Sequence, residues 1–321
     1  MRPLWRALAL LGMLGMLGLV AAACGGDPGK AKRSKAPTSQ VPALRAPTAG
    51  DSALARLPAG ADALLEVDLA RLRAHALLGP LLARMPMPTP TSPSLSLSPS
   101  PSPSLPFDLL READLVVAAV YDLAAPTART IILVAGDFAA NDAVPADGAL
   151  LLDERTFVFA NAADNERVLA LRARSASSLA SDGGLRAARD TAMPQGATGA
   201  VLRLTARLGH EARIAAAGRL ALDELPAWIS VWADVADDMA LVALLSGDDE
   251  KAAKRLATAA RHGARLVAKL APPAWRLGEL LVGLRVEERG SVARIVWLVG
   301  PARFERWAKA ALAGFTGGQG G

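Results

Sequence analysis

Hydrophobic and polar positions follow the same order twice along this chain. An apolar run at 63–68 precedes a segment at 69–85 with leucines at helical spacing, and two hairpin-like pairs of runs and a further helical segment follow. The order begins again with an apolar run at 200–205. Short runs rich in β-branched residues predict strands, whereas apolar residues three and four positions apart predict helices. Each half is therefore predicted to form a strand, a helix, two hairpins and a closing helix.

The expected hairpins join runs that are separated by short turn sequences. They pair 114–123 with 130–138, 150–153 with 156–161, 228–235 with 239–246, and 280–288 with 291–299. Helices are expected at 165–178, 248–270 and 303–315, and Gly79-Pro80 is expected to break or kink the helix at 69–85. We expect an α+β fold of two similar halves from an internal duplication, each an antiparallel sheet with helices on one face. The two sheets either lie side by side or join into one longer sheet.

Composition sets the remaining boundaries. The first half is expected at 57–190 and the second at 196–316, with a frayed tail at 317–321. Within the first half, 86–106 is a run of Pro, Ser and Thr, which cannot pack regularly and predicts a disordered insertion. Residues 24–56 are rich in small, polar and basic residues without an apolar period, which predicts a flexible tether.

The first 24 residues have a different pattern. Arg2 and Arg6 precede an unbroken apolar and small-residue run at 7–23, and Cys24, the only cysteine of the chain, follows directly. A basic start, a short apolar run and small residues before a cleavage site are typical of a secretory signal peptide. An uncleaved anchor is one alternative, but spanning a bilayer takes about 20 apolar residues. A plain secretory signal is another, and would leave Cys24 as an unpaired thiol outside the cytoplasm.

Because three alanines precede Cys24, the segment resembles the signal of bacterial lipoproteins, although Ala21 stands where that family most often has leucine. The resemblance implies that the leader 1–23 is cut between Ala23 and Cys24, and that the cysteine sulfur carries a diacylglyceryl group. Gly25 stands where aspartate retains some Gram-negative lipoproteins at the inner membrane, which favours the outer membrane. The body is similar to uncharacterised duplicated α+β lipoproteins, a similarity that rests on no motif and implies no activity.

Charge and cysteine content limit the partners. The formal net charge of +5 includes Arg2 and Arg6 of the leader. Much of the remaining excess lies at 30–35, either as a solvated tether or in contact with anionic head groups, where each cation adds about 1 kcal/mol. So small and local an excess does not predict nucleic-acid binding. A single cysteine excludes disulfide bonds within the chain and predicts no thiolate metal site.

No arrangement of residues predicts catalysis, a metal site or a cofactor. The three histidines, His75, His210 and His262, do not have the spacing of a metal motif such as HExxH. The chain has no GxSxG turn for a serine nucleophile and no glycine-rich phosphate loop. The aspartates at 234–249 lack the pattern of a calcium-binding EF-hand, and we interpret them as a hairpin turn and a helix start.

Trp228 and Trp232 are the strongest candidates for a binding surface. Side chains four positions apart on a strand share a face, and the residues between Trp228 and Trp232 alternate between the two faces. The tryptophans therefore either form an exposed aromatic patch or pack in the interior beneath a helix or the other half. The second interpretation is preferred, because the two halves must bury apolar surface against each other.

These observations lead to one hypothesis and two alternatives. The chain is expected to be a lipoprotein anchored in the membrane by its acyl chains, on the periplasmic or surface face of the cell envelope. Its non-enzymatic body would bind or scaffold an envelope protein. An extracytoplasmic, hydrolase-like enzyme with a site in the cleft between the two halves is one alternative. A structural envelope protein that forms homo-oligomers is the other.

Overall fold

The computed structural model describes most of the predicted body of the chain. The described residues are 49–84, 109–125, 128–138, 149–197, 199–214, 225–236, 238–270, 281 and 283–317. The predicted leader, Cys24, the tether up to residue 48, the insertion at 86–106 and the tail beyond Gly317 lie outside them. None of the helices within the described ranges is long and apolar enough to span a membrane.

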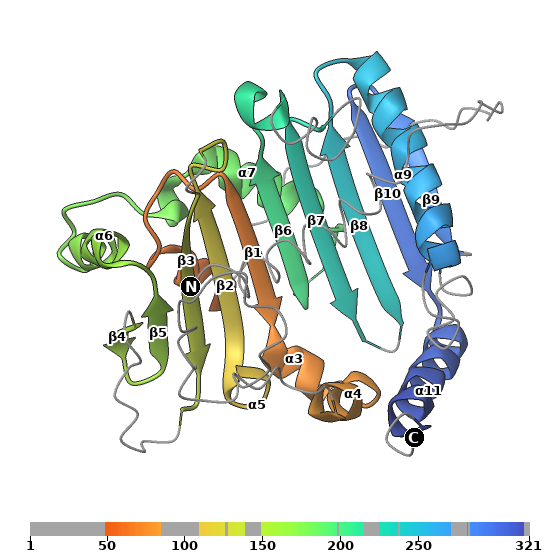
Figure 1. Ribbon diagram of the computed structural model, residues 1–321, viewed down its shortest axis with the longest axis horizontal. Coiled ribbons are helices and arrows are strands. Elements are labelled where there is room, and N and C mark those ends of the chain that lie inside the picture. Colours follow the sequence, from red (N-terminus) through yellow and green to blue (C-terminus); the bar gives the residue numbers. More distant parts are fainter. Residues whose placement is uncertain are drawn as a thin grey trace, which may run out of the picture.

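The described residues form one antiparallel sheet of ten strands (Figure 1). In chain order the strands are β1 (Ala63–Asp68), β2 (Ala113–Tyr121), β3 (Arg129–Gly136), β4 (Ala149–Asp153), β5 (Thr156–Phe159), β6 (Leu202–Arg207), β7 (Trp228–Val235), β8 (Met239–Ser246), β9 (Leu284–Arg289) and β10 (Val292–Val299). From the central pair of β1 and β6 outward, β2, β3, β5 and β4 follow on one side, and β7, β8, β10 and β9 on the other.

The predicted mixture of helix and antiparallel sheet is confirmed, and so are the four hairpins. The two halves share a single sheet, because β1 and β6 pair directly from Ala63 opposite Ala206 to Val67 opposite Leu202. β6 begins at Leu202, two residues later than the predicted run at 200–205. The halves are therefore continuous through a backbone ladder.

Helices account for most of the remaining described residues. Those whose bounds the structure describes are α2 (Ala49–Leu54), α3 (Leu69–Ala74), α4 (Leu78–Arg84), α5 (Leu109–Glu112), α6 (Ala162–Arg172), the 3-10 turn η2 (Leu179–Ser181), α7 (Gly183–Thr191), α9 (Glu250–Leu270) and α11 (Pro301–Gly317). α11 packs on α4, where Phe304 joins a cluster with Leu77 and Leu78.

Helices lie against both faces of the sheet, so the prediction of helices on one face is wrong. On β7, Val231 packs in a cluster with Leu256 of α9, whereas Trp232 packs beside Ala192 at the end of α7. Successive strand residues point to opposite faces, which places α7 and α9 on opposite sides. Both faces are covered because the strands carry apolar residues on both faces. In β2, Val117 is fully buried beneath one set of helices, while its neighbour Val116 packs on the other side.

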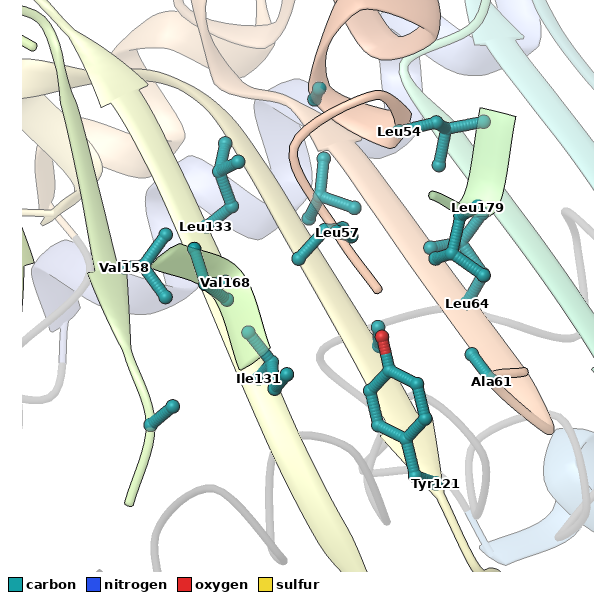
Figure 2. Packing of buried hydrophobic residues seen from close by; sticks show 14 of the residues in the cluster. Leu54, Leu57, Ala61, Leu64, Tyr121, Ile131, Leu133, Val158, Val168 and Leu179 are labelled. Carbon is teal, nitrogen blue, oxygen red and sulfur yellow. The ribbon is translucent and has the colours of Figure 1, made fainter. Parts of the chain in front are cut away.

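The largest cluster of buried side chains lies on the α7 side of the first five strands (Figure 2). Leu54 of α2 and Leu57, just after it, pack there at 1% and 0% exposure, over strand residues such as Leu64. The folded body therefore includes α2, so the predicted extent of the tether to residue 56 is wrong for residues 49–56. Leu54 and Leu57, three positions apart, pack this segment against the sheet. Its other residues are mostly small or polar, so the sequence pattern did not indicate an amphipathic helix.

The predicted helix at 69–85 is divided at His75, before Gly79-Pro80. The His75 Nδ1 atom accepts hydrogen bonds from the backbone N–H groups of Leu77 and Leu78, at 3.1 and 3.2 Å, which starts α4. Pro80 then lies in the first turn of α4, where a helix does not need its missing N–H. The predicted break at Gly79-Pro80 is therefore wrong. Pro80 is compatible with the first turn of α4, and the helix is interrupted at His75.

Candidate functional site

Trp232 lies in the interior on the α7 side of the sheet. It is 4% exposed, and its indole Nε1 donates a hydrogen bond to the carbonyl oxygen of Gly199 at 2.8 Å. Trp228 is half-buried against the largest cluster of buried side chains, on the α7 side of the sheet, with the Arg207 guanidinium 5.9 Å from its ring centroid. The tryptophans share a face of β7, as the spacing predicted. Trp232 is not part of an exposed patch in this structure.

α7 covers this face, and it is absent from the helices that the sequence predicted. The carboxylate of Asp182 caps the helix by accepting a hydrogen bond from the backbone N–H of Leu185 at 2.9 Å. Leu185 and Arg189, four positions apart, both face the sheet at 2% and 3% exposure. The available signal for this helix was the capping Asp182 followed three residues later by Leu185, which faces the sheet. Arg189 interrupts the apolar stripe that would otherwise have indicated an amphipathic helix.

Arg189 is the centre of a group of charged side chains, here called the junction cluster, of which Glu66, Arg189 and Arg203 are buried and Asp51 and Asp190 lie at the rim: Asp51, Glu66, Arg189, Asp190 and Arg203. Glu66 on β1 accepts hydrogen bonds from Nε and Nη2 of Arg189, at 2.5 and 2.8 Å. Asp51 on α2 accepts one from Nη1 at 2.6 Å. Arg203 on β6 has its Nη1 atom 3.9 Å from the Asp190 carboxylate. The cluster thus links α2, α7 and the two central strands.

The central pair of this cluster is withdrawn from water. The Glu66 and Arg189 side chains are 7% and 2% exposed. Burial opposes the charge of Arg189, but the hydrogen bonds and charge of Glu66, and then those of Asp51, hold its pKa above the usual value. Two parallel bonds between guanidinium and carboxylate fix the geometry as well as the charge. Because the guanidinium occupies both Glu66 oxygens, the arrangement is suited to holding elements together rather than to proton transfer.

The junction cluster lies where the two halves meet. Glu66 and Arg203 are directly opposite each other in the ladder between β1 and β6. The hydrolase-like alternative placed a catalytic site in a cleft at this position. In the structure, hydrogen-bonded strands fill the junction, and α7 packs against β6 and β7 beside it.

A second polar group lies near the end of β7. Arg71 of α3 donates a hydrogen bond to Asp234 at 2.8 Å, and the Asp234 side chain is 18% exposed. Burial raises the pKa of Asp234, and the charge of Arg71 opposes this rise. Nearby, the His75 Nε2–H donates to the carbonyl oxygen of Ala236 at 2.5 Å, while its Nδ1 starts α4. This group fastens α3 and α4 to the turn that follows β7.

A third polar group surrounds Tyr121 at the end of β2. Its hydroxyl donates a hydrogen bond to the carbonyl oxygen of Pro58 at 2.7 Å, and burial raises the pKa of the phenol. The guanidinium groups of Arg129 and Arg167 lie 5.5 and 5.2 Å from the ring centroid, a cation–π arrangement. Arg129 and Arg167 also both bond to the fully buried Asp164 of α6. The group holds α6 against β2 and β3.

The remaining predicted site residues are not brought together. Within the described ranges, no three His, Cys, Asp or Glu side chains are grouped so that they could hold a metal ion. His210 and His262 lie on different elements, one following β6 and the other on α9. Ala23 and Cys24, the predicted cleavage and lipidation residues, lie outside the described part of the chain.

Comparison with protein-family models, curated proteins and solved structures finds no match to this chain. Its function is therefore inferred from its own residues and geometry.

Proposed function

We propose that this protein is a lipoprotein of the cell envelope, anchored in the membrane by lipid on Cys24. The observation that carries the proposal is the order of the first 24 residues, with a basic start, an apolar run, three alanines and the lone cysteine. Cleavage after Ala23 leaves Cys24 at the N-terminus, where several acyl chains on one residue give stable attachment without a spanning helix. Gly25 favours the outer membrane as its location.

The spacing between the anchor and the body is compatible with this role. Twenty-four residues, 25–48, separate Cys24 from the first described helix, α2. A fully extended chain of that length reaches at most about 86 Å. The body can therefore work at the membrane surface or well away from it, at the periplasmic or cell-surface face.

The body has a non-enzymatic binding or scaffolding role in this proposal, with an envelope protein as its partner. The three polar groups described above support it, because each directs its charged side chains at one another and joins helices to the sheet. Their contacts stabilise a wide, continuous sheet. Such a body offers outer surfaces for a partner while its interior stays rigid.

The two halves of this body descend from an internal duplication in the same proposal. The strand order from the centre outward is the same on both sides, with the last two strands of each half exchanged in the same way. The central ladder pairs the first strand of one half, β1, with the first strand of the other, β6, and places Leu65 opposite Leu204. A comparison of homologous chains tests the idea, because equivalent positions in the halves should prefer the same classes of residue.

Metabolic labelling with a clickable fatty acid tests the anchor. The wild-type chain should be labelled in cells, and the Cys24→Ala variant, expressed at the same level, should not be. Intact-mass analysis should find the leader 1–23 removed from the wild type only. Label retained by the variant, or a wild-type chain with an unmodified Cys24, contradicts the proposal.

Crosslinking in intact cells tests the scaffolding role. The lipidated chain should crosslink reproducibly to one envelope component, and a chain secreted through a plain signal, without the cysteine, should lose much of that product. Turnover of ester, peptide or glycoside substrates by the purified protein, at rates that purification does not remove, would instead support the enzyme.

A further inference from the structure

α9 separates its apolar and charged residues completely. Its inward face packs on the sheet through buried residues such as Ala253, Leu256 and Ala260, and Leu256 contacts the cluster that contains Val231. Figure 1 shows α9 running along the edge of the sheet, against β9 and β10. One long side of the helix therefore remains on the outer surface of the molecule.

That outer side has a single sign of charge beyond the first residue of the helix. The exposed charged residues are Lys251, Lys254, Arg255, Arg261 and Arg265. With 3.6 residues per turn, these five positions fall within an arc of about 120° and extend over about 21 Å. We call this set the α9 basic face.

Two neighbouring carboxylates pair with cations of this face. Lys254 pairs with Glu250 at 3.1 Å, and Arg261 with Glu288 of β9 at 3.1 Å. All four side chains of these pairs are substantially solvent-exposed, with exposures from 31% to 69%. Exposed pairs of this kind are weak and exchange partners readily. The face therefore presents a net positive charge to an approaching surface.

We propose that the α9 basic face docks onto an anionic lipid surface. Each Lys or Arg brought near such a surface strengthens binding by about fivefold. The face is a row of cations without Phe, Tyr or Trp anywhere in 250–270, which fits fluid head groups and lacks the large stacking side chains of single-strand nucleic-acid binders. This inference rests on the proposed lipid anchor, which keeps the body near a membrane at high effective concentration.

Vesicle co-sedimentation of the unlipidated mature chain tests the docking separately from the anchor. Residues 24–321 with Cys24→Ala are mixed with vesicles of 30% phosphatidylglycerol in phosphatidylcholine, or with phosphatidylcholine alone. The protein should bind the anionic vesicles only, and raising the salt from 0.1 to 0.5 M should release it. Equal binding to both vesicles, or binding that resists salt, overturns the proposal.

Two charge-matched variants locate the surface. Lys251→Glu with Arg265→Glu should weaken binding to anionic vesicles at least about 25-fold, since two cations are lost. Arg172→Glu with Arg306→Glu, exposed elsewhere, makes the same change in net charge and should weaken binding less than threefold. Circular dichroism should show both variants folded.

Three further results overturn the proposal. The first is an equal loss of vesicle binding in the two variants, and the second is unchanged binding of the α9 variant, which would point to the basic run at 30–35. The third is tighter binding to single-stranded DNA than to vesicles at equal salt. A chain that is labelled at Cys24 in cells but fails this vesicle test overturns the docking alone. A chain that binds vesicles through α9 but is not labelled overturns the anchor alone.

Discussion

Glu66 of β1 and Arg189 of α7 are 123 residues apart in sequence and form a buried ion pair with two parallel hydrogen bonds, at 2.5 and 2.8 Å. β1 opens the first half of the sheet, and α7 is the last helix before the second half begins at β6. The pair therefore fixes the end of the first half over its own first strand. It does so beside the ladder that joins the two halves.

Removing Arg189 should destabilise the protein strongly. Arg189→Met leaves the Glu66 carboxylate buried without its cation, and breaking a buried pair in this way costs about 3–5 kcal/mol. Urea unfolding followed by circular dichroism measures the change in the free energy of unfolding. Arg186→Met on the same helix is the control, because Arg186 is exposed and should change stability by less than about 1 kcal/mol.

The double variant Glu66→Met with Arg189→Met separates the cost of a lone charge from the value of the pair. Apolar replacements of a buried ion pair are often neutral or stabilising. The double variant should therefore be more stable than Arg189→Met alone. A double variant that is no more stable would contradict the view that an unpaired Glu66 is the main cost.

Gly50 of α2 should not tolerate a side chain, although alanine normally favours a helix. A Cβ atom at Gly50 would lie 2.3 Å from Oε2 of Glu66 and 3.1 Å from Nη2 of Arg189. Because the contacted atoms belong to a fixed ion pair, Gly50→Ala should destabilise the protein by about 1–3 kcal/mol. Thermal unfolding of Gly183→Ala provides the control. Nothing lies within 4 Å of that position, so alanine there should be neutral or stabilising. Equal effects at the two glycines would argue against the close contact with Glu66.

The hairpins could be predicted from the sequence because strand and turn signals are local. β7 and β8, for example, are two apolar runs separated by a short turn that contains aspartate, and they pair as expected. The pairing of β1 with β6 has no such signal, since the partners are separated by more than a hundred residues. The sequence therefore predicted two halves, and left open whether they formed one sheet or two.

The junction cluster could not be predicted, for a related reason. Asp51, Glu66 and Arg189 form no motif, and each is an ordinary surface residue when considered alone. Only the topology brings α2, β1 and α7 together. The alternation on β7 did predict that Trp228 and Trp232 share a face. It could not show that α7 covers Trp232, because α7 itself was not expected.

Trp232→Phe should destabilise the protein more than Trp228→Phe. Phenylalanine at 232 leaves the Gly199 carbonyl without its indole donor and removes part of a buried ring, for a combined cost of about 1–3 kcal/mol. Trp228 is only half-buried, so the same change there should cost less. Chemical denaturation of the two variants measures the difference. If neither substitution changed stability, the packing role assigned to Trp232 would be wrong and a ligand-facing role would regain support.

Asp234 should make the stability of the protein fall as the pH rises. Burial raises its pKa, against the opposing charge of Arg71, so the folded state prefers the protonated carboxyl. A group whose pKa is higher in the folded state contributes stability that is complete below its unfolded pKa, about 3.9 for aspartate, and is lost as the pH rises through the folded value. Asn is neutral at every pH and lacks this loss. Asp234→Asn should therefore gain stability relative to the wild type between pH 4 and pH 7.

Urea unfolding at several pH values across this range tests the prediction. Glu154→Gln, at an exposed position in the turn between β4 and β5, controls for the loss of one acidic charge. The difference between Asp234→Asn and the wild type should grow with pH more steeply than the difference for the control. A difference that stays constant or shrinks would mean that Arg71 stabilises the ionised carboxylate more than burial opposes it. In that case the pair with Arg71 would strengthen, rather than weaken, the attachment of α3 to β7 at neutral pH.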